Sequence, residues 1–174
     1  MKHFSALILA LTLTACGSTI NPISPPRSIG QLLLNASPDE AGWGTFSPAL
    51  QHDDLADVRE LLREEKEPYT VFSPSNTAFE AYFEARGITR EEFLASDEVP
   101  EIVRAHIAPG NYYPKTFFET DRPTFDNLNG DPLVISRQGD DFYVNDVLID
   151  GPVLEDQKKQ ESGVLYTLLG VIEP

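Results

Sequence analysis

The segment 69–73 alternates β-branched and aromatic residues with a period of two, which is typical of a strand. The alternation puts Tyr69, Val71 and Ser73 on one face, and Thr70 and Phe72 on the other. Pro74 should end the strand, because proline cannot donate the next ladder hydrogen bond. Ser75 or Asn76 can then cap a helix through a side-chain oxygen. That helix carries an aromatic stripe at helical spacing, which we expect to pack on the strand: Phe79, Tyr82 and Phe83.

The region 28–63 is predicted to be helical in two parts. The first part has a short apolar face, formed by Ile29, Leu32 and Leu33, and the sequence Gly42-Trp43-Gly44 interrupts it. Trp43 is the only tryptophan, and we expect a partly buried packing residue there; a ligand platform is the alternative. In the second part, Asp53 or Asp54 can cap a helix whose opposite face is charged and solvated. Its apolar stripe is Leu55, Val58, Leu61 and Leu62.

Two more helices are predicted after the aromatic one. The sequence Thr89-Arg90-Glu91-Glu92 has the pattern of a capping box, so a short helix is expected over 89–96. A further helix is expected over 99–107, and Pro109-Gly110 should end it. One side of this helix carries Ile102, Val103, His106 and Ile107.

From Asn111 onward the pattern changes to short apolar or alternating segments, which predict strands. The expected strands are 125–128, 132–136, 142–144, 147–149 and 164–169. The expected turns are Asn129-Gly130, Gln138-Gly139 and Asp150-Gly151. Helices that come first, strands that come mostly last and one early strand together predict an α+β fold.

Length, charge and cysteine content narrow the function classes. The chain has 174 residues, which suits one domain. Its formal net charge of −15 argues against nucleic acid as a partner, because phosphate backbones require a basic face. This charge is compatible with a solvated surface, with cations or with basic partners. Cys16 is the only cysteine, so no disulfide can form within the chain.

The N-terminal residues resemble a bacterial lipoprotein signal. Lys2 precedes an apolar run that is too short to span a bilayer as a stable helix, and Leu-Thr-Ala-Cys at 13–16 resembles the lipobox. The resemblance implies that residues 1–15 are a signal peptide and that Cys16 is lipidated, which anchors the chain stably. Residues 16–27 then form a proline-rich tether. The alternative is an ordinary signal peptide cut near Ala15, with a free thiol.

No pattern in the sequence favours catalysis or a resident metal. A triad of His106, Asp97 and Ser96 is conceivable, but no spacing supports it, and a hydrogen-bonded core histidine is expected instead. No zinc pattern occurs, and the loop 126–131 lacks the ligand spacing of an EF-hand. We therefore expect no cofactor and turn or cap chemistry at the acidic positions. Weak calcium binding at the surface is the alternative, with Asp53, Asp54, Asp57, Asp140 and Asp141 as further acidic residues.

Three segments together resemble the fasciclin (FAS1) domain family over residues 28–174. Residues 70–79 read T-V-F-S-P-S-N-T-A-F, close to the family's T-V-F-A-P-T-N-x-A-F. Residues 106–110 read H-I-A-P-G and resemble its central H-V-V-P-G, and residues 163–174 resemble its closing G-V-I-H-V-I-D-x-V-L-L-P. The matching positions are Thr70, Val71, Phe72, Pro74, Asn76, Phe79, His106, Pro109, Gly110 and Gly163, with Tyr166 in the closing segment.

The resemblance implies a single domain in which a wedge of β strands is flanked by several short helices. It assigns the motif positions, including His106, a structural role, and it implies a non-catalytic domain. The family's adhesion role rests partly on a Tyr-His pair beside the central motif. This chain has Ala105-His106 there, and Tyr166 stands where relatives often have histidine. Both departures weaken any transfer of integrin-type recognition.

These observations lead us to expect a lipid-anchored domain of the cell surface that mediates adhesion or matrix interaction through a protein or polysaccharide. No Asp follows Cys16, so the inner-membrane retention signal is absent, and an outer membrane is the expected address where the cell has one. The alternative is an envelope scaffold or accessory subunit with a dedicated membrane-protein partner. A third hypothesis is an envelope hydrolase that uses His106.

Overall fold

The computed structural model describes residues 28–35, 43–64, 66–115, 117, 123–155 and 163–174. The expected signal peptide 1–15 and the tether 16–27, including Cys16, lie outside these residues. Of the expected interruption Gly42-Trp43-Gly44, the structure describes Trp43 and Gly44.

Within the described residues, the strands form one sheet in the order β2-β1-β7-β6-β5-β4-β3. The strands are β1 (Tyr69–Pro74), β2 (Ile107–Pro109), β3 (Thr124–Asp126), β4 (Pro132–Gln138), β5 (Asp141–Val144), β6 (Val147–Glu155) and β7 (Gly163–Leu168). β1 runs antiparallel to β2 and parallel to β7, and every other neighbouring pair is antiparallel. The strand predicted from alternation therefore lies inside the sheet.

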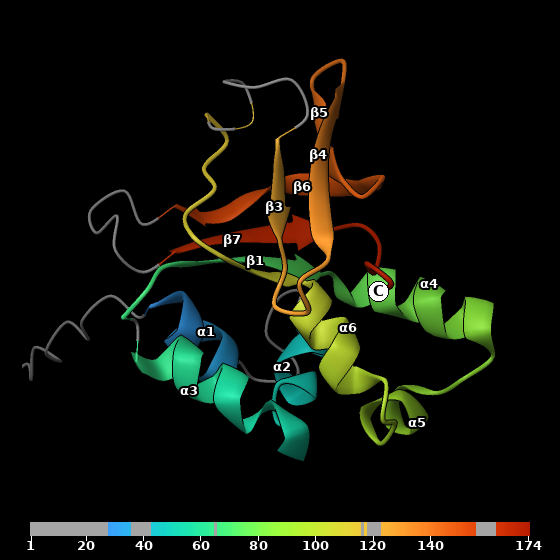
Figure 1. The fold of residues 1–174 in the computed structure, drawn as a ribbon. Coiled ribbons are helices and arrows are strands. Elements are labelled where there is room, and N and C mark those ends of the chain that lie inside the picture. Colours follow the sequence, from blue (N-terminus) through green and yellow to red (C-terminus); the bar gives the residue numbers. More distant parts are fainter. Residues whose placement is uncertain (1–27, 36–42, 65, 116, 118–122, 156–162) are drawn as a thin grey trace, which may run out of the picture.

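Helices cover one side of β1. They are α1 (Ile29–Asn35), α2 (Phe46–Ala49), the 3₁₀ helix η1 (Asp53–Leu55), α3 (Ala56–Glu64), α4 (Asn76–Arg86), α5 (Arg90–Leu94) and α6 (Val99–Ala105). In Figure 1, α1, α2, α3, α5 and α6 gather below β1, whereas β3, β4 and β5 rise above it. This arrangement is the expected α+β plan, a wedge of strands flanked by short helices.

The two faces of β1 contribute to two separate cores. Val71 joins a helix-side core, which also contains Leu165 and the aromatic side chains of α4 and α5. Phe72 joins a sheet-side core with Tyr166 and Phe125. All six residues of β1 are buried, which explains why both alternating sets of its side chains are apolar or small.

The predicted helix starts after β1 are confirmed. Ser75 caps α4, since its Oγ accepts a hydrogen bond from the Ala78 N–H at 3.1 Å. Thr89 and Glu92 form the reciprocal bonds of a capping box at the start of α5. The aromatic stripe of α4 is also confirmed, since Phe79, Tyr82 and Phe83 all lie in the helix-side core.

The prediction of a helix over 99–107 is wrong at its C-terminal end. α6 ends at Ala105, and Ile107–Pro109 form the edge strand β2. Residues 107–109 pair antiparallel with β1, so Pro109 lies in a strand and does not end the helix. The apolar spacing fits a helix, but the ladder that β1 offers determines the backbone here. Such long-range pairing is invisible to periodicity.

The predicted cap at Asp53 or Asp54 is also wrong. Both aspartates are the first residues of η1, and the cap is His52, whose Nδ1 accepts from the Asp54 N–H at 3.3 Å. The stripe after this cap is only partly buried. Leu61 is 37% exposed because α3 turns that position toward solvent. Trp43, expected to be partly buried, is buried in the helix-side core.

One of the three expected turns is wrong. Gly130 and Gly139 adopt positive φ angles of 87° and 66° between consecutive antiparallel strands, as expected of turn glycines. Asp150-Gly151 instead lies inside β6, where the register with β7 shifts as in a β-bulge. The turn between β5 and β6 is Asn145-Asp146, with φ of 46° and 65°. Asn and Asp tolerate this left-handed region, so no glycine is required.

Candidate functional site

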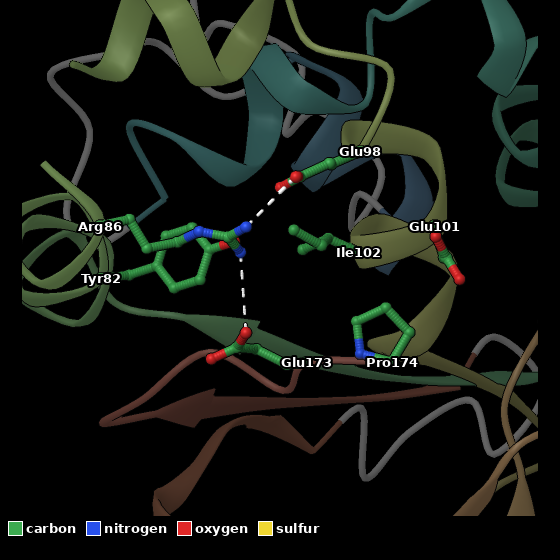
Figure 2. Close-up of a pocket in the computed structure, with 7 residues that line it drawn as sticks. All are labelled: Tyr82, Arg86, Glu98, Glu101, Ile102, Glu173 and Pro174. Atoms are coloured by element: carbon green, nitrogen blue, oxygen red, sulfur yellow. Dashed lines mark hydrogen bonds and ion pairs between the residues drawn. The ribbon is translucent and has the colours of Figure 1, made fainter. Parts of the chain in front are cut away.

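A hollow of about 220 Å³ lies between α4, α6 and the segment after β7 (Figure 2). We call it the Arg86 pocket. Its lining residues are Tyr82 and Arg86 from α4, Glu98, Glu101 and Ile102 from the start of α6, and Glu173 and Pro174 from the last segment. Three elements that are distant in the sequence thus form one concave site.

Arg86 connects these three elements. Tyr82 and Arg86 are one helical turn apart on α4, so the guanidinium lies over the ring, 5.2 Å from its centroid, and donates to the phenol oxygen. Arg86 Nη2 lies 3.2 Å from Glu98 Oε1, and Nη1 lies 3.6 Å from Glu173 Oε2. The Arg86 side chain is 37% exposed, so solvent screens both ion pairs.

Burial favours the neutral form of the phenol in this pocket. The Tyr82 side chain is 8% exposed, and this burial raises the pKa of the phenol above its usual value. Tyr82 therefore remains neutral at ordinary pH and presents an oxygen that accepts the hydrogen bond of Arg86.

The Arg86 pocket has an excess of negative charge. Its lining contains three glutamates and one arginine. Glu98 and Glu173 pair with Arg86, whereas in the described part of the chain no ion pair involves Glu101. No three histidine, cysteine or acidic side chains among the described residues lie close enough to share a metal ion. The pocket is thus suited to bind a cationic organic group.

His106 lies away from solvent at the end of α6. Its side chain is 0% exposed and contacts the Phe46 ring edge-on. Nδ1 lies 2.7 Å from the Ile102 carbonyl oxygen, and Nε2 accepts from the Ile172 N–H at 2.9 Å. The ring is therefore neutral with its proton on Nδ1, and burial lowers its pKa to about 4.

These contacts confirm the expectation of a hydrogen-bonded core histidine. Both ring nitrogens bind backbone atoms, so neither is available to activate a nucleophile. Ser96 donates its hydroxyl hydrogen to the Phe93 carbonyl instead. The geometry gives no support to a triad of His106, Asp97 and Ser96.

The first, central and closing motif segments meet around Thr70. Its Oγ1 donates to the Gly110 carbonyl at 2.8 Å and accepts from the Tyr112 N–H at 3.0 Å. The Tyr166 hydroxyl donates to the Tyr112 carbonyl at 2.7 Å. Gly110 has a φ of 108°, a conformation that side chains rarely adopt, so glycine suits this position.

The remaining motif residues lie in the core or at the ends of strands and helices. Phe72 is stacked between Phe125 and Tyr166, and Phe79 packs among aromatic rings of α4 and α5. Val71 is fully buried, Pro74 ends β1, and Pro109 is exposed on β2. Asn76 is the first residue of α4, and its buried Oδ1 has no hydrogen-bond partner in the described structure.

Gly163 is required by a close approach between neighbouring strands. Its φ is 121°, and a Cβ there would lie 2.0 Å from the Tyr69 carbonyl oxygen on β1. A similar approach occurs where α1 crosses α3, because a Cβ on Gly30 would lie 1.8 Å from the Leu62 carbonyl oxygen. The motif identified Gly163, but no local pattern identified Gly30.

The acidic loop 126–131 is held by local hydrogen bonds that are typical of turns. The side-chain oxygen of Asn127 accepts from the Asn129 and Asp131 N–H groups, each at 2.9 Å. This is the local role that we expected. Of the other acidic positions, Asp57 pairs with Arg104 at 2.9 Å, and Asp140 with Arg137 at 3.5 Å.

Sequence reasoning missed the Arg86 pocket. The spacing of Tyr82 and Arg86 on a predicted helix is a signal that could have suggested their contact. No local pattern distinguishes Glu98 and Glu101 from other glutamates on the surface, and none connects Glu173 with α4. The convergence follows from the path of the chain after β7.

Among the described residues, no helix combines the length and apolar character needed to cross a bilayer. No curated protein was found to resemble the sequence. Among solved structures, the chain is similar to a FAS1 domain pair from the insect cell adhesion molecule fasciclin I. The TM-score is 0.66 at 13% sequence identity, and the match covers 86% of this chain and 52% of the insect chain. The similarity supports the fold alone.

The sequence also matches a family model, that of the fasciclin domain, over residues 42–174. This region contains every strand of the sheet and all three motif segments. The chain therefore belongs to the fasciclin domain family.

Proposed function

We propose that the protein is a lipid-anchored domain of the cell envelope that mediates adhesion or matrix interaction and performs no catalysis. The observation that carries this proposal is the fasciclin-domain match over residues 42–174. The similar insect protein is described as a cell adhesion molecule, which supports the same class of function. The partner is a protein or polysaccharide of the cell surface.

The anchor is the second part of the proposal. Residues 1–15 act as a lipoprotein signal peptide, Cys16 carries the lipid, and residues 16–27 form a tether to the domain 28–174. In a cell with an outer membrane, the domain is held there. The resemblance of residues 13–16 to a lipobox supports this assignment.

The structure supports an interaction that differs from integrin-type recognition. Ala105 occupies the position of the family's tyrosine and is fully buried. Tyr166 is 1% exposed and binds the backbone of Tyr112. Neither side chain is available to a partner, so the contact surface is formed by other residues.

A crosslinking pull-down tests this proposal. The bait is the full chain in a non-ionic detergent, incubated with envelope and matrix extracts of its own organism, with and without calcium. A bait with quenched crosslinker is the control. Capture of polysaccharide or several surface proteins supports adhesion, and capture only with calcium supports cation binding at the acidic loops. One stoichiometric membrane protein supports the alternative, a scaffold or accessory subunit. Retention of no envelope or matrix material contradicts the adhesive function.

A further inference from the structure

We propose that the Arg86 pocket binds the side chain of a lysine or arginine presented by a protein partner. The inference rests on the proposed function, because it assumes that the domain binds a partner. It adds the chemistry that the partner must present and the place where it binds.

The interior of the Arg86 pocket matches the stem of such a side chain. Tyr82, Ile102 and Pro174 contribute apolar atoms to the lining, and Figure 2 shows Ile102 and Pro174 directed toward the hollow. Lysine and arginine lay their aliphatic stems on apolar surface while the charged head stays at a polar edge. The hollow, of about 220 Å³, has the scale of one long side chain rather than a large ligand.

The rim of the Arg86 pocket matches the charged head. Glu98, Glu101 and Glu173 surround the hollow on different sides in Figure 2. Arg86 balances part of their charge, but Glu101 is engaged in no ion pair within the described structure. An incoming cation can therefore pair with Glu101 while the bonds of Arg86 stay intact. The net charge of −15 on the chain favours the approach of a basic partner.

Two other ligand classes fit less well. An anion would have to compete for Arg86 with Tyr82, Glu98 and Glu173, and it would meet the excess of negative charge. A divalent cation requires several carboxylates around one point. No such group of three exists among the described residues. A single positive charge on a long apolar stem satisfies both the rim and the interior.

Peptide titration of the full chain tests the proposal. The ¹⁵N-labelled protein is kept in a non-ionic detergent and titrated with three glycine-serine peptides. The peptides are capped at both ends and differ only at one central residue, which is lysine, arginine or norleucine. We expect the lysine and arginine peptides to cause saturable amide shifts around Arg86, Glu98–Ile102 and the last segment. Added salt should weaken the binding of both the lysine and the arginine peptide.

Two charge-matched variants separate this site from general attraction to an acidic protein. Glu101 and Glu80 are both exposed glutamates, and only Glu101 lines the pocket. Glu101→Gln should weaken binding of the lysine peptide about two- to fivefold, as expected for the loss of one exposed ion pair. Glu80→Gln should leave it unchanged. Equal weakening by both variants, shifts spread over the whole acidic surface, or equal binding of the norleucine peptide would each overturn the proposal.

The outcome of the peptide titration can be separated from the outcome of the pull-down. A captured partner that binds the Glu101→Gln protein as well as the wild type leaves the proposed function intact and refutes the assignment of the pocket. Saturable lysine binding at the pocket without any captured partner supports the site and contradicts the adhesive function.

Discussion

Acidification should destabilise this domain through one buried histidine. His106 is neutral in the folded state because it is fully buried, and its pKa is lowered from 6.5 to about 4. In the unfolded chain the ring is in water and takes up a proton below about pH 6.5. The unfolded state thus binds more protons between these two values, so stability falls as the pH falls through this window. Above pH 6.5 the contribution of His106 is fully present.

The magnitude follows from the two pKa values. One proton taken up over this interval corresponds to a total loss of about 3 kcal/mol. About 2 kcal/mol of it should be lost between pH 7 and pH 5, before most carboxylates are protonated. The structural cause is specific, because protonated Nε2 can no longer accept the Ile172 N–H at 2.9 Å. The loss is a large fraction of the about 5–15 kcal/mol that stabilises a typical domain.

Urea unfolding at a series of pH values measures this loss, with the fluorescence of Trp43, the only tryptophan, as the signal. The midpoint should fall by about 1 M urea between pH 7 and pH 5. His106→Gln retains a neutral donor and acceptor but does not titrate, so its stability should hardly change over this range. Parallel losses in wild type and His106→Gln would refute the reasoning.

Three further predictions concern the core, a close approach and the anchor. Phe72→Ala should cost about 3–5 kcal/mol in urea unfolding, because Phe72 is fully buried and stacked on Tyr166; a loss below about 1 kcal/mol would contradict its place in the core. Gly163→Ala should cost about 2–6 kcal/mol by the same measurement, because a Cβ meets the Tyr69 carbonyl oxygen and φ is positive; near-normal stability would argue against this approach of the strands. Cys16→Ser should move the protein from the membrane to the soluble fraction on cell fractionation, and continued membrane retention would argue against lipidation.

The features that the sequence predicted are those decided within a few residues. Ser75 caps α4 through the N–H three positions on, and Thr89 bonds with Glu92 in the same turn. The strand at 69–73 alternates strongly enough to be identified without its neighbours. Such local signals also predicted the α+β class, since the order of helices and strands along the chain is sufficient for it.

The features that the sequence did not reveal depend on partners far along the chain. Ile107 fits a helical stripe, but it pairs with Val71 across the edge of the sheet. The cap at His52 depends on a ring nitrogen, which the usual cap preferences do not include. The Arg86 pocket requires Glu173 to reach α4 after β7. Periodicity carries no information on these contacts.

The motif that identifies the family and the surface proposed to meet a partner are formed by different residues. Thr70, Val71, Phe72 and His106 are all fully buried, and their bonds hold β1, the end of α6 and the last segment together. The fold requires residues in such positions, whatever the partner. Specificity has to come from exposed side chains outside the motif. The Arg86 pocket satisfies this condition, because Glu101 on its rim is exposed while its interior rests on the shared core through Ile102.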